Sequence, residues 1–117
     1  MALQLDAAAF EKLVIEELDM LPDDMVEGIE NVAFVTEDLP EDGSLDLLGL
    51  YQGVALTHRD TYGFGELPDR IVLYREPLLS VSDDLEELHD QVHVTLVHEI
   101  GHYYGLDEEQ LHELGWA

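Results

Sequence analysis

Apolar residues near the start of the chain recur at the three- and four-residue spacing of one helix face. They are Phe10, Leu13, Val14, Leu18 and Leu21. Asp6 precedes them in a position suited to an N-cap, and Pro22 ends the run because proline cannot continue a helix. The pattern predicts a helix over residues 6–21, followed by a short helical turn over residues 22–29.

The middle of the chain has shorter apolar runs. Residues 31–37 and 70–75 are rich in strand-forming side chains and predict two strands, the second of which is the clearest in the chain and is ended by Pro77. A further short strand is expected over residues 54–58. Turn-forming residues mark two loops, one over residues 38–50 with Pro40, Gly43, Ser44 and Gly49, the other with Gly63, Gly65 and Pro68.

A long helix is expected over residues 83–104. Ser82 can cap its N-terminus, acidic residues follow in the first turns, and Gly105 can adopt the left-handed conformation that ends helices. One face carries an apolar stripe made of Leu85, Leu88, Val92, Leu96, Ile100 and Tyr103, with Val94 and Val97 beside it. The C-terminal half of this helix should be buried, with His98 and His102 off the stripe and facing a cleft.

The most specific feature is the octapeptide His98-Glu99-Ile100-Gly101-His102-Tyr103-Tyr104-Gly105. Two histidines four apart share one helix face, about 5 to 6 Å apart at Cβ, and can bind one metal ion. Glu99 points to the flank of that face, where it can take a proton from a metal-activated water. His-Glu-x-x-His arises by chance in roughly 4 of 100 shuffled chains of this composition. We therefore interpret it as a metallopeptidase zinc site rather than as two structural histidines.

A catalytic zinc ion needs three protein ligands and an open position, so a third donor must follow the two histidines. Glu108, six places after His102, would return to the ion after the turn at Gly105. Asp107 is the second choice, because a shift of one residue in the turn would exchange them. His112 is the third, since a short helix beginning near Asp107 would project it away.

Three other histidines are less suited to this site. His89 and His93 have the same spacing but lie on another side of the helix from His98, which predicts a structural or solvent-facing role. His58 belongs to a different segment and is a candidate transition-state stabiliser.

Length and composition bound the class of protein. A chain of 117 residues predicts a single domain over residues 1–117. With no cysteine, a transition-metal site must use imidazole and carboxylate ligands. The charged residues of the first helix exclude a secretory signal, and no apolar run reaches the roughly 18 residues of a membrane span. We expect a soluble, cytoplasmic protein.

Four basic against 28 acidic residues give a formal net charge of −24. Such a field repels phosphate backbones and anionic lipids, so neither nucleic acid nor a membrane is expected as a partner. The acidic surface either maintains solubility or selects cationic peptides. Arg59, Arg70 and Arg75 fall in one short segment and either offset local acidity or bind a peptide carboxylate.

The sequence resembles the small bacterial minimal-zincin proteins, whose pattern is His-Glu-x-x-His-x-x-Gly-x-x-Asp. Beyond the octapeptide, the likeness covers Leu48-Gly49-Leu50-Tyr51-Gln52-Gly53, Leu67-Pro68-Asp69-Arg70-Ile71 and Leu111-His112-Glu113-Leu114-Gly115-Trp116. It implies a helix carrying His98 and His102, with Glu99 as general base and an acidic third ligand. The departure is Glu108 in place of the Asp of the family pattern. No Met follows His102, so membership of the metzincins is not implied.

Together with the elements above, the resemblance predicts an α+β fold, a compact minimal zincin with about three helices on a two- to three-stranded sheet. Its implied function is a peptidase with one zinc ion, which cleaves a peptide or protein bound along an edge strand such as residues 70–75. The alternative is a non-catalytic metal- or peptide-binding module on the same scaffold, because the short chain leaves little material for a deep groove. A less favoured interpretation is an rRNA-maturation endoribonuclease; Glu99, Glu108 and the net charge argue against it.

Overall fold

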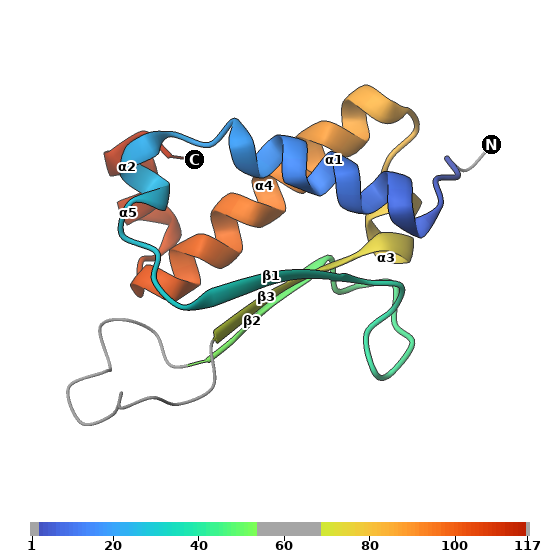
Figure 1. Ribbon diagram of the computed structural model, residues 1–117, viewed down its shortest axis with the longest axis horizontal. Coiled ribbons are helices and arrows are strands. Elements are labelled where there is room, and N and C mark those ends of the chain that lie inside the picture. The colour runs from blue at the N-terminus through green and yellow to red at the C-terminus, as the bar shows by residue number, and fades with distance from the viewer. Residues whose placement is uncertain (1–2, 54–68, 117) are drawn as a thin grey trace.

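The computed structural model describes residues 3–53 and 69–116, which form an α+β fold (Figure 1). In chain order the elements are α1 (Ala7–Asp19), α2 (Asp23–Val26), β1 (Val32–Glu37), β2 (Gly49–Gln52), β3 (Asp69–Tyr74), α3 (Arg75–Ser80), α4 (Leu85–Tyr104) and α5 (Glu108–Leu114). The predicted fold class is confirmed. The described residues contain five helices instead of about three: α2 lies within the helical turn predicted over residues 22–29, and α3 was not predicted.

The strands form one mixed sheet in the order β1-β3-β2. β3 pairs in parallel with β1 and antiparallel with β2, so that Val72 lies opposite Val35 on one side and Leu50 on the other. Residues 71–74 of this central strand are buried, as their near-continuous apolar sequence leads one to expect. The expectation of an edge strand at residues 70–75 is therefore wrong. β1 and β2 occupy the edges of the described sheet.

β2 lies where the sequence predicted the end of a loop. The strand expected over residues 54–58 falls outside the described residues. β2 has four residues and begins with Gly49, a residue type of low strand propensity, so its local signal is weak. It is stabilised instead by pairing with β3 and by packing against α4.

Helices α1 and α4 lie over one face of the sheet, with α3 at one end and α5 following α4 (Figure 1). Between the helices and the sheet lies the core, which includes Phe10, Leu13, Met25, Ile71, Leu73, Leu78, Leu88, Val92, Leu96 and Ile100. The apolar stripe of α4 is buried except at its first residue, Leu85. Val94, expected to be buried, is 61% exposed, because it lies on the side of α4 away from the sheet. Among the described helices, none combines the length and apolar content required to cross a bilayer.

Both ends of α4 have defined caps. Asp84, and not Ser82, caps the N-terminus: its side chain accepts a hydrogen bond of 2.8 Å from the backbone N–H of Glu87. The hydroxyl of Ser82 instead donates a hydrogen bond to the carbonyl of Leu78 in α3. Gly105 ends the helix in the left-handed conformation, with φ of 75°, as predicted.

α3 follows β3 without a loop, which the sequence did not predict. Pro77 was expected simply to end the strand. It occupies the third position of α3, where a backbone N–H has no partner within the helix, so proline is tolerated there. The strand ends at Tyr74, before Pro77, and the proline fits the first turn of the helix that follows.

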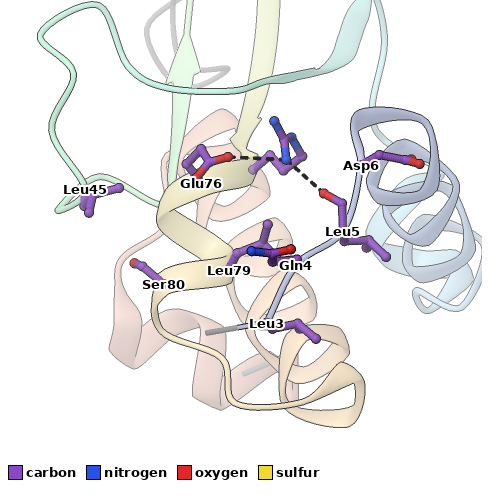
Figure 2. Close-up of a pocket in the computed structure, with 9 residues that line it drawn as sticks. Leu3, Gln4, Leu5, Asp6, Leu45, Glu76, Leu79 and Ser80 are labelled. Atoms are coloured by element: carbon purple, nitrogen blue, oxygen red, sulfur yellow. Dashed lines mark hydrogen bonds and ion pairs between the residues drawn. The ribbon is translucent and has the colours of Figure 1, made fainter. Parts of the chain in front are cut away.

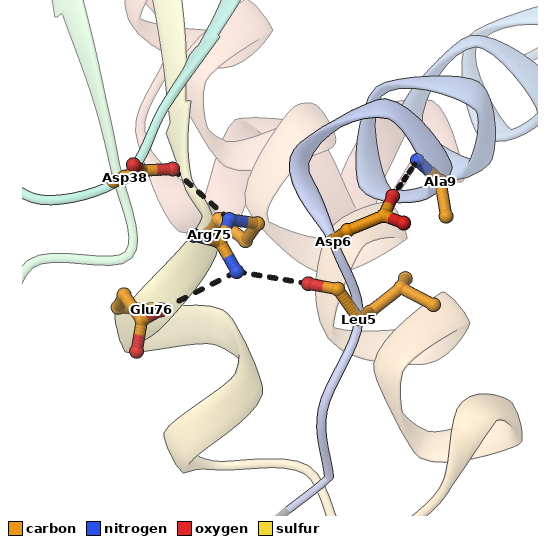
Figure 3. Close-up of polar contacts among 6 residues, drawn as sticks. All are labelled: Leu5, Asp6, Ala9, Asp38, Arg75 and Glu76. Atoms are coloured by element: carbon orange, nitrogen blue, oxygen red, sulfur yellow. Dashed lines mark hydrogen bonds and ion pairs between the residues drawn. The ribbon is translucent and has the colours of Figure 1, made fainter.

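A polar network around Arg75 fixes the junction of β3 and α3 (Figure 3). The guanidinium donates to Asp38 at 3.0 Å and to the carbonyl of Leu5 at 2.8 Å, and it lies 3.3 Å from Glu76. The hydrogen bond to Asp38, together with the negative charge of that carboxylate, raises the pKa of Arg75 above its usual value. Arg70 similarly pairs with Glu37. Of the two roles predicted for the arginines, the offsetting of local acidity is the one these contacts favour, and Arg59 lies outside the described residues.

Candidate metal centre

The C-terminal half of α4 brings together the three polar residues of the motif. Leu96, Ile100 and Tyr103 turn one face of the helix into the core, so the remaining face presents His98 and His102 to solvent. Their rings lie 4.6 Å apart between centroids. One donor atom from each imidazole and one from Glu99 all lie within 4.8 Å of one another.

The contacts of the two imidazoles leave the same nitrogen of each ring available. Nδ1 of His98 lies 3.0 Å from Oε1 of Glu108, and Nδ1 of His102 lies 3.3 Å from Oε1 of Glu99. Nε2 of either ring has no hydrogen bond or ion pair to any residue in the described part of the chain. An Nδ1–H directed at a carboxylate fixes the tautomer whose Nε2 lone pair is free to bind a metal.

Glu99 is buried although it is an acidic residue, with 6% of its surface exposed. Its position depends on Gly49 of β2. A Cβ atom at residue 49 would lie 2.6 Å from Cγ2 of Thr95 and 3.5 Å from Cγ of Glu99, so a larger residue would force β2 away from α4. This contact was not predicted from the sequence, and its signal was the glycine that opens Gly49-Leu50-Tyr51.

Gly101 has a comparable role on the opposite side of the motif. A Cβ atom there would lie 2.9 Å from Cδ1 of Leu111, which is buried beneath the helix. The absence of a side chain lets α5 pack closely on α4 after the turn at Gly105. This packing places Glu108, the first residue of α5, beside His98.

The three candidates for a third ligand have distinct surroundings. Glu108 contacts His98 but lies outside the cluster whose donor atoms are all within 4.8 Å. Asp107 caps α5, where its carboxylate accepts the backbone N–H of Gln110 in a capping box. His112 lines a cavity next to α5. The structure thus brings one of the three into contact with the histidine pair.

The other predicted histidines are not part of this cluster. His89 and His93 both face Glu17 of α1, with 2.7 Å and 3.7 Å between Nδ1 and the carboxylate oxygens. Glu17 is buried between the two helices, so its contacts with the histidines join α1 to α4. They support the structural role predicted for His89 and His93. His58 lies outside the described residues.

The donor set suits zinc. It consists of two imidazoles, whose Nε2 atoms contact no polar group in the described part of the chain, and nearby carboxylates, without a thiol. This combination is found in catalytic zinc sites. A cavity of about 540 Å³ lies elsewhere, between the N-terminal segment and α3 (Figure 2), and shares no lining residue with the cluster. The larger cavity and the cluster of metal-binding side chains thus lie in different places. The cluster is the better indicator of a functional site, because its residue types and spacing are more specific than the size of a cavity.

Comparisons with known proteins identify the family of the chain. The model of the zincin-like metallopeptidase family matches residues 29–116. A solved structure of a conserved hypothetical protein from Thermus thermophilus is similar, with 26% sequence identity and a TM-score of 0.57, over 94% of this chain and 97% of that one. A comparison with curated proteins gave no significant match. Since the family model covers most of the sequence, including both edge strands of the described sheet and the whole motif, the chain belongs to the zincin-like metallopeptidase family.

Proposed function

We propose that the protein is a zinc-dependent peptidase. The observation that carries the proposal is the pair of imidazoles on α4, whose Nε2 atoms contact no polar group among the described residues, with the Glu99 carboxylate beside them. His98 and His102 would hold the ion and Glu108 would supply the third ligand. Glu108 contacts Nδ1 of His98 in this structure, so it would have to turn away from that nitrogen to reach the ion, and its 66% accessible side chain has the room to do so.

When bound, zinc would polarise the substrate carbonyl and lower the pKa of a water molecule toward about 7. The carboxylate of Glu99 then acts on protons. It accepts one from the attacking water and donates it to the nitrogen of the leaving amine as the peptide bond breaks. The carboxylate lies between β2 and the two imidazoles, next to the position at which they would hold the ion.

β2 is the strand best placed to receive an extended peptide or protein segment. It is an edge strand of the described sheet, and its first residue, Gly49, packs on Glu99. A peptide that pairs with this edge would gain main-chain hydrogen bonds and bring its backbone near the motif. This assignment replaces residues 70–75, which the structure places in the centre of the sheet.

The alternative is a non-catalytic module that binds metal or peptide. It is favoured by one observation: Glu99 is nearly inaccessible and already contacts His102, as expected of a carboxylate that only orients a ligand. The two functions differ in whether Glu99 is needed for turnover.

Glu99→Gln tests the choice, because it keeps the shape of the side chain and removes its basicity. For a peptidase we expect zinc binding to remain within about tenfold of wild type and hydrolysis of a peptide library to fall by at least about 100-fold. Glu86→Gln on the exposed first turn of the same helix is the matched control and should change neither. Zinc binding without any Glu99-dependent hydrolysis would establish the binding module instead.

A further inference from the structure

A cavity of about 270 Å³ lies between α4 and α5, directly beside His98. Its walls are mostly apolar: Val94 and Val97 come from α4, Leu111 from α5 and Trp116 from the residues after it. The imidazole of His98 is part of the lining. The cavity therefore adjoins the metal centre at His98, and none of its described lining residues belongs to the sheet.

The size of this cavity limits what it can hold. An apolar cavity of about 150 Å³ accommodates a benzene ring, whereas sites for whole drug-sized ligands occupy about 300 to 1,000 Å³. A volume of about 270 Å³ thus fits one large aliphatic or aromatic side chain. Val94, which is 61% exposed, is an apolar wall that such a side chain would cover.

The lining of the cavity also carries polar groups. Glu108 is the single carboxylate among the described lining residues and accompanies the imidazoles of His93, His98 and His112, in a chain whose formal net charge is −24. Neither lysine nor arginine is among the residues that line the cavity. Basic groups next to the inserted side chain would therefore meet complementary charge, and acidic groups would be repelled.

We propose that this cavity is a specificity pocket that takes one bulky apolar side chain of a peptide whose neighbouring residues are basic. The inference rests on the proposed peptidase function, because a side chain held beside His98 places its own backbone next to the metal centre. Val94, Val97, Leu111 and Trp116 provide the apolar contact, and the acidic surface of the chain, with its net charge of −24, attracts a neighbouring basic residue.

Trp116 makes the proposal directly measurable, since it is the single tryptophan of the chain and lines the cavity. The probe is the capped peptide Ala-Lys-Leu-Lys-Ala, titrated into metal-free protein so that no turnover is required. We expect a saturable change in tryptophan fluorescence. Ala-Lys-Gly-Lys-Ala, with equal charge and no side chain to insert, should bind at least about tenfold more weakly, and Ala-Glu-Leu-Glu-Ala should also bind more weakly.

Val94→Ser tests the pocket from the side of the protein. The residue is exposed, so the fold should tolerate the change, and affinity for the leucine peptide should fall about three- to tenfold. Val81→Ser is the matched control, because Val81 is also exposed and lies before the other end of α4. It should leave affinity unchanged.

Equal affinity for the leucine and glycine peptides, or an equal effect of Val94→Ser and Val81→Ser, would overturn the pocket. These results are separable from the fate of the peptidase proposal. If the zinc-loaded protein cleaves peptides without preferring the leucine sequence, the pocket is wrong and the peptidase stands. If the leucine peptide binds selectively but is never cleaved, the pocket stands and the protein is a binding module.

Discussion

At the scale of single residues, the metal centre depends on glycines as much as on its ligands. Gly49 and Gly101 carry no chemistry, yet they let β2 and α5 approach the two sides of the motif. The ligand spacing could be predicted from the sequence because it follows from helix geometry. The two close approaches could not, because they depend on which segments meet in space.

Glu108 is the residue whose role in metal binding is most directly testable. Whether it binds zinc itself or orients His98, Glu108→Ala should lower zinc affinity by at least about tenfold, as loss of an orienting carboxylate costs roughly 10- to 100-fold. Competition against a chromophoric chelator measures the affinity. Glu109→Gln is the control, because Glu109 is the next residue of α5, is also exposed and makes no hydrogen bond or ion pair with His98 in the described part of the chain. If the Glu108 variant binds zinc as tightly as the wild type, Glu108 is not part of the metal site.

Gly49→Ala should destabilise the fold by about 1–3 kcal/mol, because the added methyl meets Cγ2 of Thr95 at 2.6 Å and the carbonyl of Val72 at 3.1 Å. Urea unfolding gives the free energy. Thr95→Ser removes the methyl that is contacted, so the double variant should regain part of the loss relative to Thr95→Ser alone. Full additivity of the two substitutions would contradict the inferred contact.

At the scale of elements, the sequence predicted the long elements better than the short ones. α1 and α4 have enough turns for an apolar stripe to be recognised, and Gly105 marks the end of α4. β2 and α3 have too few residues for a periodic pattern of apolar positions to be recognised. They form because they pack against β3 and α4. The same limit explains the displaced N-cap, because Ser82, Asp83 and Asp84 are all suitable caps and tertiary contacts select among them.

The end of α4 is tied to α2 by Tyr104, whose hydroxyl donates to the carbonyl of Met25 at 2.6 Å. Burial, with the neighbouring Tyr103, raises the pKa of Tyr104 above 10.0, its ordinary value. A group whose pKa is raised on folding contributes stability below its unfolded pKa and loses that contribution as the pH rises through the folded value. The free energy of unfolding should therefore decrease above about pH 10.

Tyr104→Phe should cost about 0.5–1.5 kcal/mol at neutral pH, through loss of this hydrogen bond, and should make the alkaline decline shallower. Burial also raises the pKa of Tyr74, so a residual decline is expected in the variant. Urea unfolding as a function of pH, together with tyrosinate absorbance, measures both effects. An identical alkaline profile in the variant would exclude Tyr104 as a source.

At the scale of the whole molecule, the net charge of −24 dominates. Raising the ionic strength from about 0.01 M to 0.15 M shortens the screening length from about 30 Å to 8 Å and weakens the repulsion among the carboxylates. The Tm should therefore rise with sodium chloride, as measured by circular dichroism. A Tm that falls would mean that ion pairs such as Arg70–Glu37 contribute more than the repulsion does.

The parallel pairing of β1 with β3 has a kinetic consequence. Val32 of β1 pairs with Asp69 of β3, and the whole of β2 lies between these two residues in the sequence. A long segment of chain must therefore lose conformational entropy before the first hydrogen bond between β1 and β3 can form. The α4–α5 hairpin, in contrast, joins neighbours in sequence and can assemble within its own span. Chains emerging from denaturant should thus acquire the histidine-bearing helix early and the sheet late, which makes sheet closure the slow step of refolding.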